Sequence, residues 1–248
     1  MFHNHVKKDY SYGWITPDII AKTPAAAWFH SENSVAKAVK AVFPFFAWFS
    51  YLLGINDGSH FIPLKNQRLW KETPAVEFRK CLISTASVAF FATLNYFVWG
   101  QNLAAMAFYY LAPLVMFGWW LVTVTYLQHH HDDSIVYDNQ DWKFLDSAFE
   151  TVDRKYGLGI DHLSHHITDG HVAHHLFYTL IPHYNLPIAT KAIRSFLKQN
   201  DAEHVYRLED TKDFPARVHR NVMKFGLKAR RANPNLSQST PTPTPDSL

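Results

Sequence analysis

The sequence has almost no cysteine, since Cys81 is the only one in 248 residues. Neither an intramolecular disulfide framework nor a thiolate metal site can be built within this chain, which fits a reducing compartment. Net charge is also small, at +3, and the lysines and arginines are scattered instead of forming a stripe. Nucleic acid is therefore not expected as a partner.

Charged residues are missing from two long apolar stretches. The first, residues 81–99, would span about 28 Å as a helix. The second, residues 103–127, is long enough to cross a bilayer with some tilt and contains Pro113, which membrane helices tolerate. Because only residues 100–102 connect them, we predict an integral membrane hairpin of two spans, at about 81–99 and 103–127.

Basic residues precede the first apolar stretch and are missing from the connection between the two. By the positive-inside rule, both outer ends of the hairpin face the cytoplasm. Histidines before and after the hairpin would then lie on the same side of the membrane, where they could share a site. The basic residues are Lys65, Arg68, Lys71, Arg79 and Lys80.

A third apolar stretch, residues 36–55, carries Lys37 and Lys40 and is broken by Pro44. These features favour an interfacial or re-entrant helix over a full span. An ordinary buried helix is the alternative.

The chain becomes more polar after the second span, and residues 128–231 are predicted to form a cytosolic, histidine-rich helical cap. Helices are expected at 141–156 and 188–199, where apolar residues recur at helical intervals. The tail, 232–248, is rich in Pro, Ser, Thr and Asn and is predicted to be disordered. The predicted fold class is mainly α.

Histidine is concentrated in one region, since ten of the 16 lie between positions 129 and 183. In the GHVAHH motif, His171, His174 and His175 fall at i, i+3 and i+4, which places three imidazoles on one helix face at metal-ligand spacing. A hydrogen-bonded surface cluster is the alternative, but further histidines nearby favour metal. Neutral imidazoles suit zinc, copper or iron, and without HExxH or a cysteine set, iron is the better candidate.

Several sequence blocks resemble the C-terminal half of the membrane-bound fatty acid desaturases, in particular the methyl-end group that acts at the Δ12 or ω-3 position. The resemblance covers most of residues 2–194. The blocks are TYLQHHH at 125–131, TVDRKYG at 151–157, HHITDGHVAHHLFYTLIPHYNLPIATKAI at 165–193 and DGSHF at 57–61.

The resemblance implies a non-haem di-iron site held by three histidine boxes, HxxxH, HxxHH and HxxHH, on the cytosolic face of a four-helix membrane scaffold. His171, His174 and His175 match the third box, and His129 matches the extra histidine after the last membrane helix. His131 is a further candidate ligand, with the alternative that it and His130 are solvated neighbours.

Further residues are implied to support these ligands. His165 matches the family's histidine before the HNIT asparagine, and His166 stands where the family has that asparagine, which changes the available hydrogen bonds. Asp169 is expected to fix an imidazole tautomer or, alternatively, to cap the helix that carries His171. For His183 we expect a structural role.

The resemblance also implies the reaction and its partners. An acyl chain carried by a membrane phospholipid or by coenzyme A would receive a cis double bond in an oxygen-dependent reaction. Electrons would come from cytochrome b5 or ferredoxin. The location would be the endoplasmic reticulum membrane, with the boxes facing the cytosol, and a homo-oligomer is compatible with this interpretation.

The chain departs from the family pattern at its start. MFHNHVKKDYSYGWITP resembles the stretch after the second box, so residues 1–231 correspond to a partial desaturase domain without the first two boxes, and His3 and His5 do not replace them. We expect that a di-iron centre does not assemble and that this chain alone is inactive. Two alternatives are a non-catalytic membrane protein that binds a partner such as the full-length enzyme, and a related di-iron hydroxylase or acetylenase.

Overall fold

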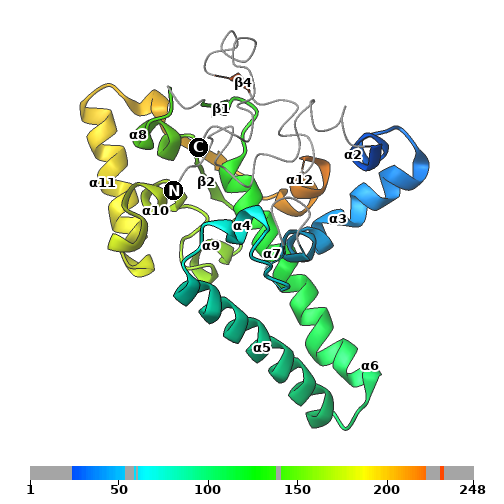
Figure 1. Cartoon of the computed structure of the whole chain (residues 1–248). Coiled ribbons are helices and arrows are strands. Elements are labelled where there is room, and N and C mark those ends of the chain that lie inside the picture. Colours follow the sequence, from blue (N-terminus) through cyan, green and yellow to red (C-terminus); the bar gives the residue numbers. More distant parts are fainter. Residues whose placement is uncertain (1–23, 54–58, 60, 138–140, 222–229, 232–248) are drawn as a thin grey trace, which may run out of the picture. The chain divides into compact units, whose positions relative to one another are not determined.

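The computed structural model describes residues 24–53, 59, 61–137, 141–221 and 230–231 (Figure 1). Predictions for the tail at 232–248 and for His3 and His5 lie outside these residues. The chain divides into two compact units, one formed by Glu32–Thr123 and the other by the residues on either side of it.

The unit Glu32–Thr123 is built from long helices, which confirms a mainly α chain. Its elements are α3 (Ser34–Leu53), α4 (Arg68–Lys71), α5 (Ala75–Val98), α6 (Leu103–Met106), the π-helical turn η1 (Ala107–Leu111) and the first part of α7 (Ala112–His129).

The two predicted spans correspond to α5 and to the continuous run from α6 through α7. Leu103–His129 forms one apolar helical rod of 27 residues, interrupted only by the π turn η1. Pro113 lies two residues after the end of this turn, and its missing N–H and its ring disfavour regular α-helical hydrogen bonding with the turn before it. α5 contains no buried residue, although side chains such as Phe90 and Val98 are large and apolar. Such a surface is suited to lipid.

A third helix is also long and apolar enough to cross a membrane. α3, Ser34–Leu53, continues through Pro44 without a break, so the predicted interruption there is wrong. One proline removes a single backbone donor, and membrane helices tolerate that loss. With three candidate spans among the described residues, the predicted count of two is not confirmed.

The other unit mixes short helices with two pairs of parallel strands. β2 (Val152–Lys155) pairs with β3 (Arg207–Asp210), and β1 (Ile135–Val136) pairs with β4 (Arg230–Arg231). Its helices are α2 (Pro24–Phe29), α8 (Phe144–Phe149), α9 (Ile160–Leu163), α10 (His171–Phe177), α11 (Leu186–Gln199), α12 (Phe214–Asn221) and the 3-10 turns η2 (Tyr178–Leu180), η3 (His183–Asn185) and η4 (Glu203–Val205).

The strand β2 corrects the predicted helix at 141–156. Only Phe144–Phe149 is helical, and the chain then turns into β2, whose Val152 and Asp153 are fully buried. The pairing partner is distant in sequence, so local periodicity carried no sign of it. The predicted helix at 188–199 is confirmed as α11.

The core of this unit surrounds β2 and α10. Val152, Val172, Ala173 and Val218 are completely buried. The Tyr156 ring stacks on the Phe214 ring of α12, with centroids 4.4 Å apart. β2 therefore lies at the centre of the packing that supports the histidine-bearing helix.

Candidate metal centre

The helix α10 begins at His171 because the residue before it has no side chain. A Cβ at Gly170 would lie 2.8 Å from the carbonyl oxygen of His166 and 3.1 Å from the Cβ of Leu186. Both distances are shorter than ordinary contacts. Only glycine allows α10 to start this close to the loop before it and to α11.

Three buried histidines meet where α7 ends and α10 begins. His129, His171 and His175 are each only 5–6% exposed, and each offers a ligand atom within 4.8 Å of the other two. The Nε2 atoms of His129 and His171 are 3.2 Å apart. Among the described residues, this is the one group of three or more side chains arranged to hold a metal ion.

The geometry of this histidine cluster fits one transition-metal ion. Two imidazole nitrogens bound at about 2.1 Å lie roughly 3.0–3.4 Å apart when the angle at the metal is about 90–110°, which includes the observed 3.2 Å. Nδ1 of His171 lies 3.1 Å from the carbonyl oxygen of Ile167. Because a carbonyl only accepts, Nδ1 carries the proton and Nε2 is left as the ligand atom.

Arg154 of β2 holds the end of α7. Its Nε donates to the Leu127 carbonyl at 2.7 Å and its Nη2 to the His130 carbonyl at 3.1 Å. The other branch pairs with Glu209 and donates to Thr211 at 3.2 Å. The side chain is almost fully buried. These bonds occupy carbonyls on either side of His129 and thus fix its position.

Asp153, the residue before Arg154, holds the start of α10. Its Oδ1 accepts from the Val172 N–H at 2.8 Å, and its Oδ2 accepts from the Tyr206 hydroxyl. Burial raises the pKa of Asp153 to about 6, while the hydrogen bonds from Tyr206 and Val172 act in the opposite direction. Two adjacent residues of β2 therefore position the two helices that carry the cluster.

His131 and His174, both predicted ligands, lie outside the cluster. Nε2 of His131 pairs with Glu209 at 2.7 Å, and its Nδ1 accepts from the Asp133 N–H at 3.1 Å, so both ring nitrogens are engaged. The hydrogen bond from His131 to Glu209 is the main reason that the pKa of Glu209 falls to about 2. His174 is half-buried next to His171 and His175, and burial lowers its pKa, which favours the neutral form that binds metal.

The residues predicted to support the ligands have other contacts. Nδ1 of His166 lies 3.0 Å from Oδ1 of Asp169, and the His165 ring lies 4.4 Å from the His183 ring. Gly170 occupies the N-cap position of α10 and has no side chain to cap the helix, and the alternative role of Asp169 as a cap stays a prediction. Asp153 contacts the start of α10.

Sequence reasoning missed Asp153, Arg154 and Glu209 as residues that support the site. Asp153 and Arg154 stand within TVDRKYG, one of the blocks that carried the family resemblance, so a signal was present. Their roles depend on β2 pairing with β3, which places Glu209 beside Arg154.

Comparisons with known proteins show which family the chain resembles. The sequence model described as "Fatty acid desaturase" matches residues 3–207. The chain is 34% identical over 214 residues to the Delta(12) fatty acid desaturase fat-2 of Caenorhabditis elegans, covering 84% of this chain and 53% of that protein. It is 36% identical over 224 residues to the Omega-3 fatty acid desaturase fat-1 of the same organism, covering 87% and 51%.

A plant relative matches more closely over a shorter segment. The Delta(12)-fatty-acid desaturase of Arabidopsis thaliana is 48% identical over 97 residues, which are 39% of this chain and 25% of that protein. The chain thus spans about half the length of the two nematode relatives. No solved structure gives a significant match.

Proposed function

Because the chain belongs to the fatty acid desaturase family, we propose that it carries part of the iron site of an enzyme that inserts a cis double bond at the Δ12 or ω-3 position of an acyl chain. The observation that supports this most directly is the buried cluster of His129, His171 and His175. Relatives named for the Δ12 and the ω-3 reaction are about equally similar, so both positions stay in the proposal.

The roles follow from the geometry of these side chains. His129, His171 and His175 would hold one iron ion, with His171 in the tautomer set by Ile167. His174 would offer its nitrogen to a second iron ion, since it lies beside the cluster without joining it. Iron bound here would supply the activation of dioxygen that acyl-chain desaturation needs.

The number of ligands determines what this chain would do alone. Within the part of the chain that the structure describes, three clustered histidines and one neighbour are fewer nitrogens than two iron ions would need in a histidine-only site. We therefore expect iron binding by the 248-residue chain but no double-bond formation by it alone. We further propose that the acyl chain is carried by a phospholipid or by coenzyme A, and that electrons come from cytochrome b5 or ferredoxin. The proposed location is the endoplasmic reticulum membrane, with the site facing the cytosol.

A chimera tests this function. Residues 1–207 would replace the matching segment of the C. elegans Delta(12) desaturase, and yeast expressing the chimera would be analysed for fatty acids. We expect new cis double bonds, lost in His171→Ala and His175→Ala but retained in His183→Ala, whose side chain is exposed. Hydroxylated or acetylenic products would assign a related di-iron reaction instead. A chimera that accumulates and binds iron without modifying any acyl chain would contradict the proposal.

A further inference from the structure

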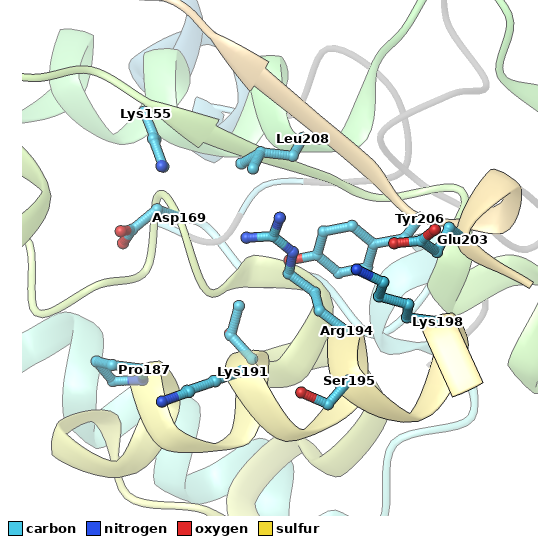
Figure 2. A pocket seen from close by; sticks show the side chains of 11 residues that line it. Lys155, Asp169, Pro187, Lys191, Arg194, Ser195, Lys198, Glu203, Tyr206 and Leu208 are labelled. Atoms are coloured by element: carbon cyan, nitrogen blue, oxygen red, sulfur yellow. The ribbon is translucent and has the colours of Figure 1, made fainter. Parts of the chain in front are cut away.

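A cavity of about 450 Å³ lies between α11 and the β2–β3 strand pair (Figure 2), and none of the three cluster histidines lines it. Six charged side chains line it: Lys155, Asp169, Lys191, Arg194, Lys198 and Glu203. Cations thus outnumber carboxylates by four to two.

Three of the cations share one face of α11. Lys191, Arg194 and Lys198 are spaced at i, i+3 and i+7, so they lie on the same side of the helix. Lys155 approaches the same cavity from β2 (Figure 2). Like charges at this spacing repel one another, and a bound anion would relieve that repulsion.

The carboxylates within reach do not neutralise these cations. Within the described part of the chain, none of Lys155, Lys191, Arg194 and Lys198 makes a salt bridge. Asp169, one of the two carboxylates, is already paired with His166 at 3.0 Å. The cavity therefore keeps a surplus of positive charge.

One cation is held in place. The Arg194 guanidinium lies over the Tyr206 ring, 5.8 Å from its centroid, and Figure 2 shows it directed into the cavity between Lys155 and Lys198. Tyr206 is itself anchored by its hydroxyl on the buried Asp153. A positioned, planar fork of N–H donors is suited to the oxygens of a phosphate.

We propose that this cavity binds a phosphate group carried by a larger molecule. Arg194 donates hydrogen bonds to two phosphate oxygens, while Lys198 and Lys155 neutralise the remaining charge of the phosphate. The volume of the cavity exceeds that of a single phosphate, which leaves room for the remainder of the ester. Two sources share this chemistry: a lipid headgroup and a soluble phosphate ester. The proposal uses none of the three cluster histidines, and binding is measured without the desaturase reaction.

Calorimetric titration of the full chain in uncharged detergent tests it with two probes, adenosine 3′,5′-bisphosphate and short-chain phosphatidic acid. We expect saturable binding of at least one probe. Arg194→Gln and Lys198→Gln should each weaken it about tenfold, and Glu203→Gln should tighten it about threefold. Lys143→Gln removes an exposed positive charge outside the cavity and should leave binding unchanged.

The probes also separate the two sources. Binding of the bisphosphate alone assigns a soluble ester, binding of phosphatidic acid alone assigns a headgroup, and both outcomes support the site. The proposal is overturned if neither probe binds, if the α11 variants bind like the unmodified chain, or if Lys143→Gln weakens binding as much as they do. Misfolding would weaken binding in every variant, so the tighter binding expected for Glu203→Gln distinguishes a charge effect from misfolding.

Discussion

The Nε2 atoms of His129 and His171 lie 3.2 Å apart, although 42 residues separate the two histidines in the sequence. The link between them is the short strand β2. Arg154 binds carbonyls at the end of α7, where His129 lies, and Asp153 binds the first turn of α10, which carries His171. Two neighbouring side chains, pointing to opposite faces of one strand, therefore hold the two helices that carry the cluster.

The first prediction concerns Arg154. Replacement by Lys keeps a positive charge but loses the planar fork, so at least one of the Leu127 and His130 carbonyls loses its donor. We expect Arg154→Lys to lower the free energy of unfolding by about 1–3 kcal/mol, measured by thermal or denaturant unfolding in detergent. Arg220 forms an exposed ion pair with Asp213, so Arg220→Lys is the control. It should change the free energy of unfolding by less than about 0.5 kcal/mol. Equal effects of the two variants would contradict the role of Arg154.

A second prediction follows from the raised pKa of Asp153. The pKa is about 6 in the folded chain against an ordinary value of 3.8, so between these values the folded state binds a proton that the unfolded state has released. This group therefore makes stability decrease as the pH rises through that window.

Asp153→Asn removes this ionisation while keeping an oxygen that accepts from the Val172 N–H. Relative to the unmodified chain, the variant should gain stability as the pH is raised from about 4 to 7, measured as the difference in Tm at each pH. Asp210→Asn, at an exposed carboxylate on β3, is the matched control. A Tm difference for Asp153→Asn that stays constant with pH would show that the carboxylate is not desolvated.

The third prediction concerns the membrane hairpin. Because the chain has a single cysteine, cysteine labelling can test it after one substitution. In a Cys81→Ala background, we expect Glu72→Cys and Lys143→Cys to react with an impermeant maleimide from the cytosolic side. Gln101→Cys, in the connection between α5 and α6, should react only from the opposite side. Reaction of all three positions from one side would contradict a hairpin that crosses the membrane.

The same labelling tests whether α3 crosses the membrane. If α3 is interfacial or re-entrant, as its lysines indicate, Glu32→Cys reacts on the same side as Glu72→Cys. Reaction of Glu32→Cys on the opposite side would instead make α3 a third span, which its length and composition also permit.

The sequence predicted those features that depend on local pattern. Uncharged apolar length located α5 and the α6–α7 rod, and helical spacing located α10 and α11. Spacing also placed His171, His174 and His175 on one short helix, and the family resemblance added His129.

The features that the sequence did not predict depend on contacts between distant segments. Helical periodicity cannot show that Val152 pairs with Arg207, which replaces the second half of a predicted helix with β2. Nor does the spacing of histidines show which of them meet. His131 lies two residues beyond His129 but turns to Glu209 on β3, while His175 joins the cluster and His174 does not. Tertiary packing around β2 determines which histidines join the cluster.

The iron content of the purified 248-residue chain, loaded anaerobically with Fe²⁺ and freed of excess metal, tests the central claim most directly. The cluster predicts about one tightly bound iron ion per chain, lost in His129→Ala, His171→Ala and His175→Ala. It should be retained in His183→Ala, whose ring is exposed and packs against His165. Iron that persists after His129→Ala and His171→Ala, or that is lost equally in His183→Ala, would contradict the assignment of these three histidines as a metal centre.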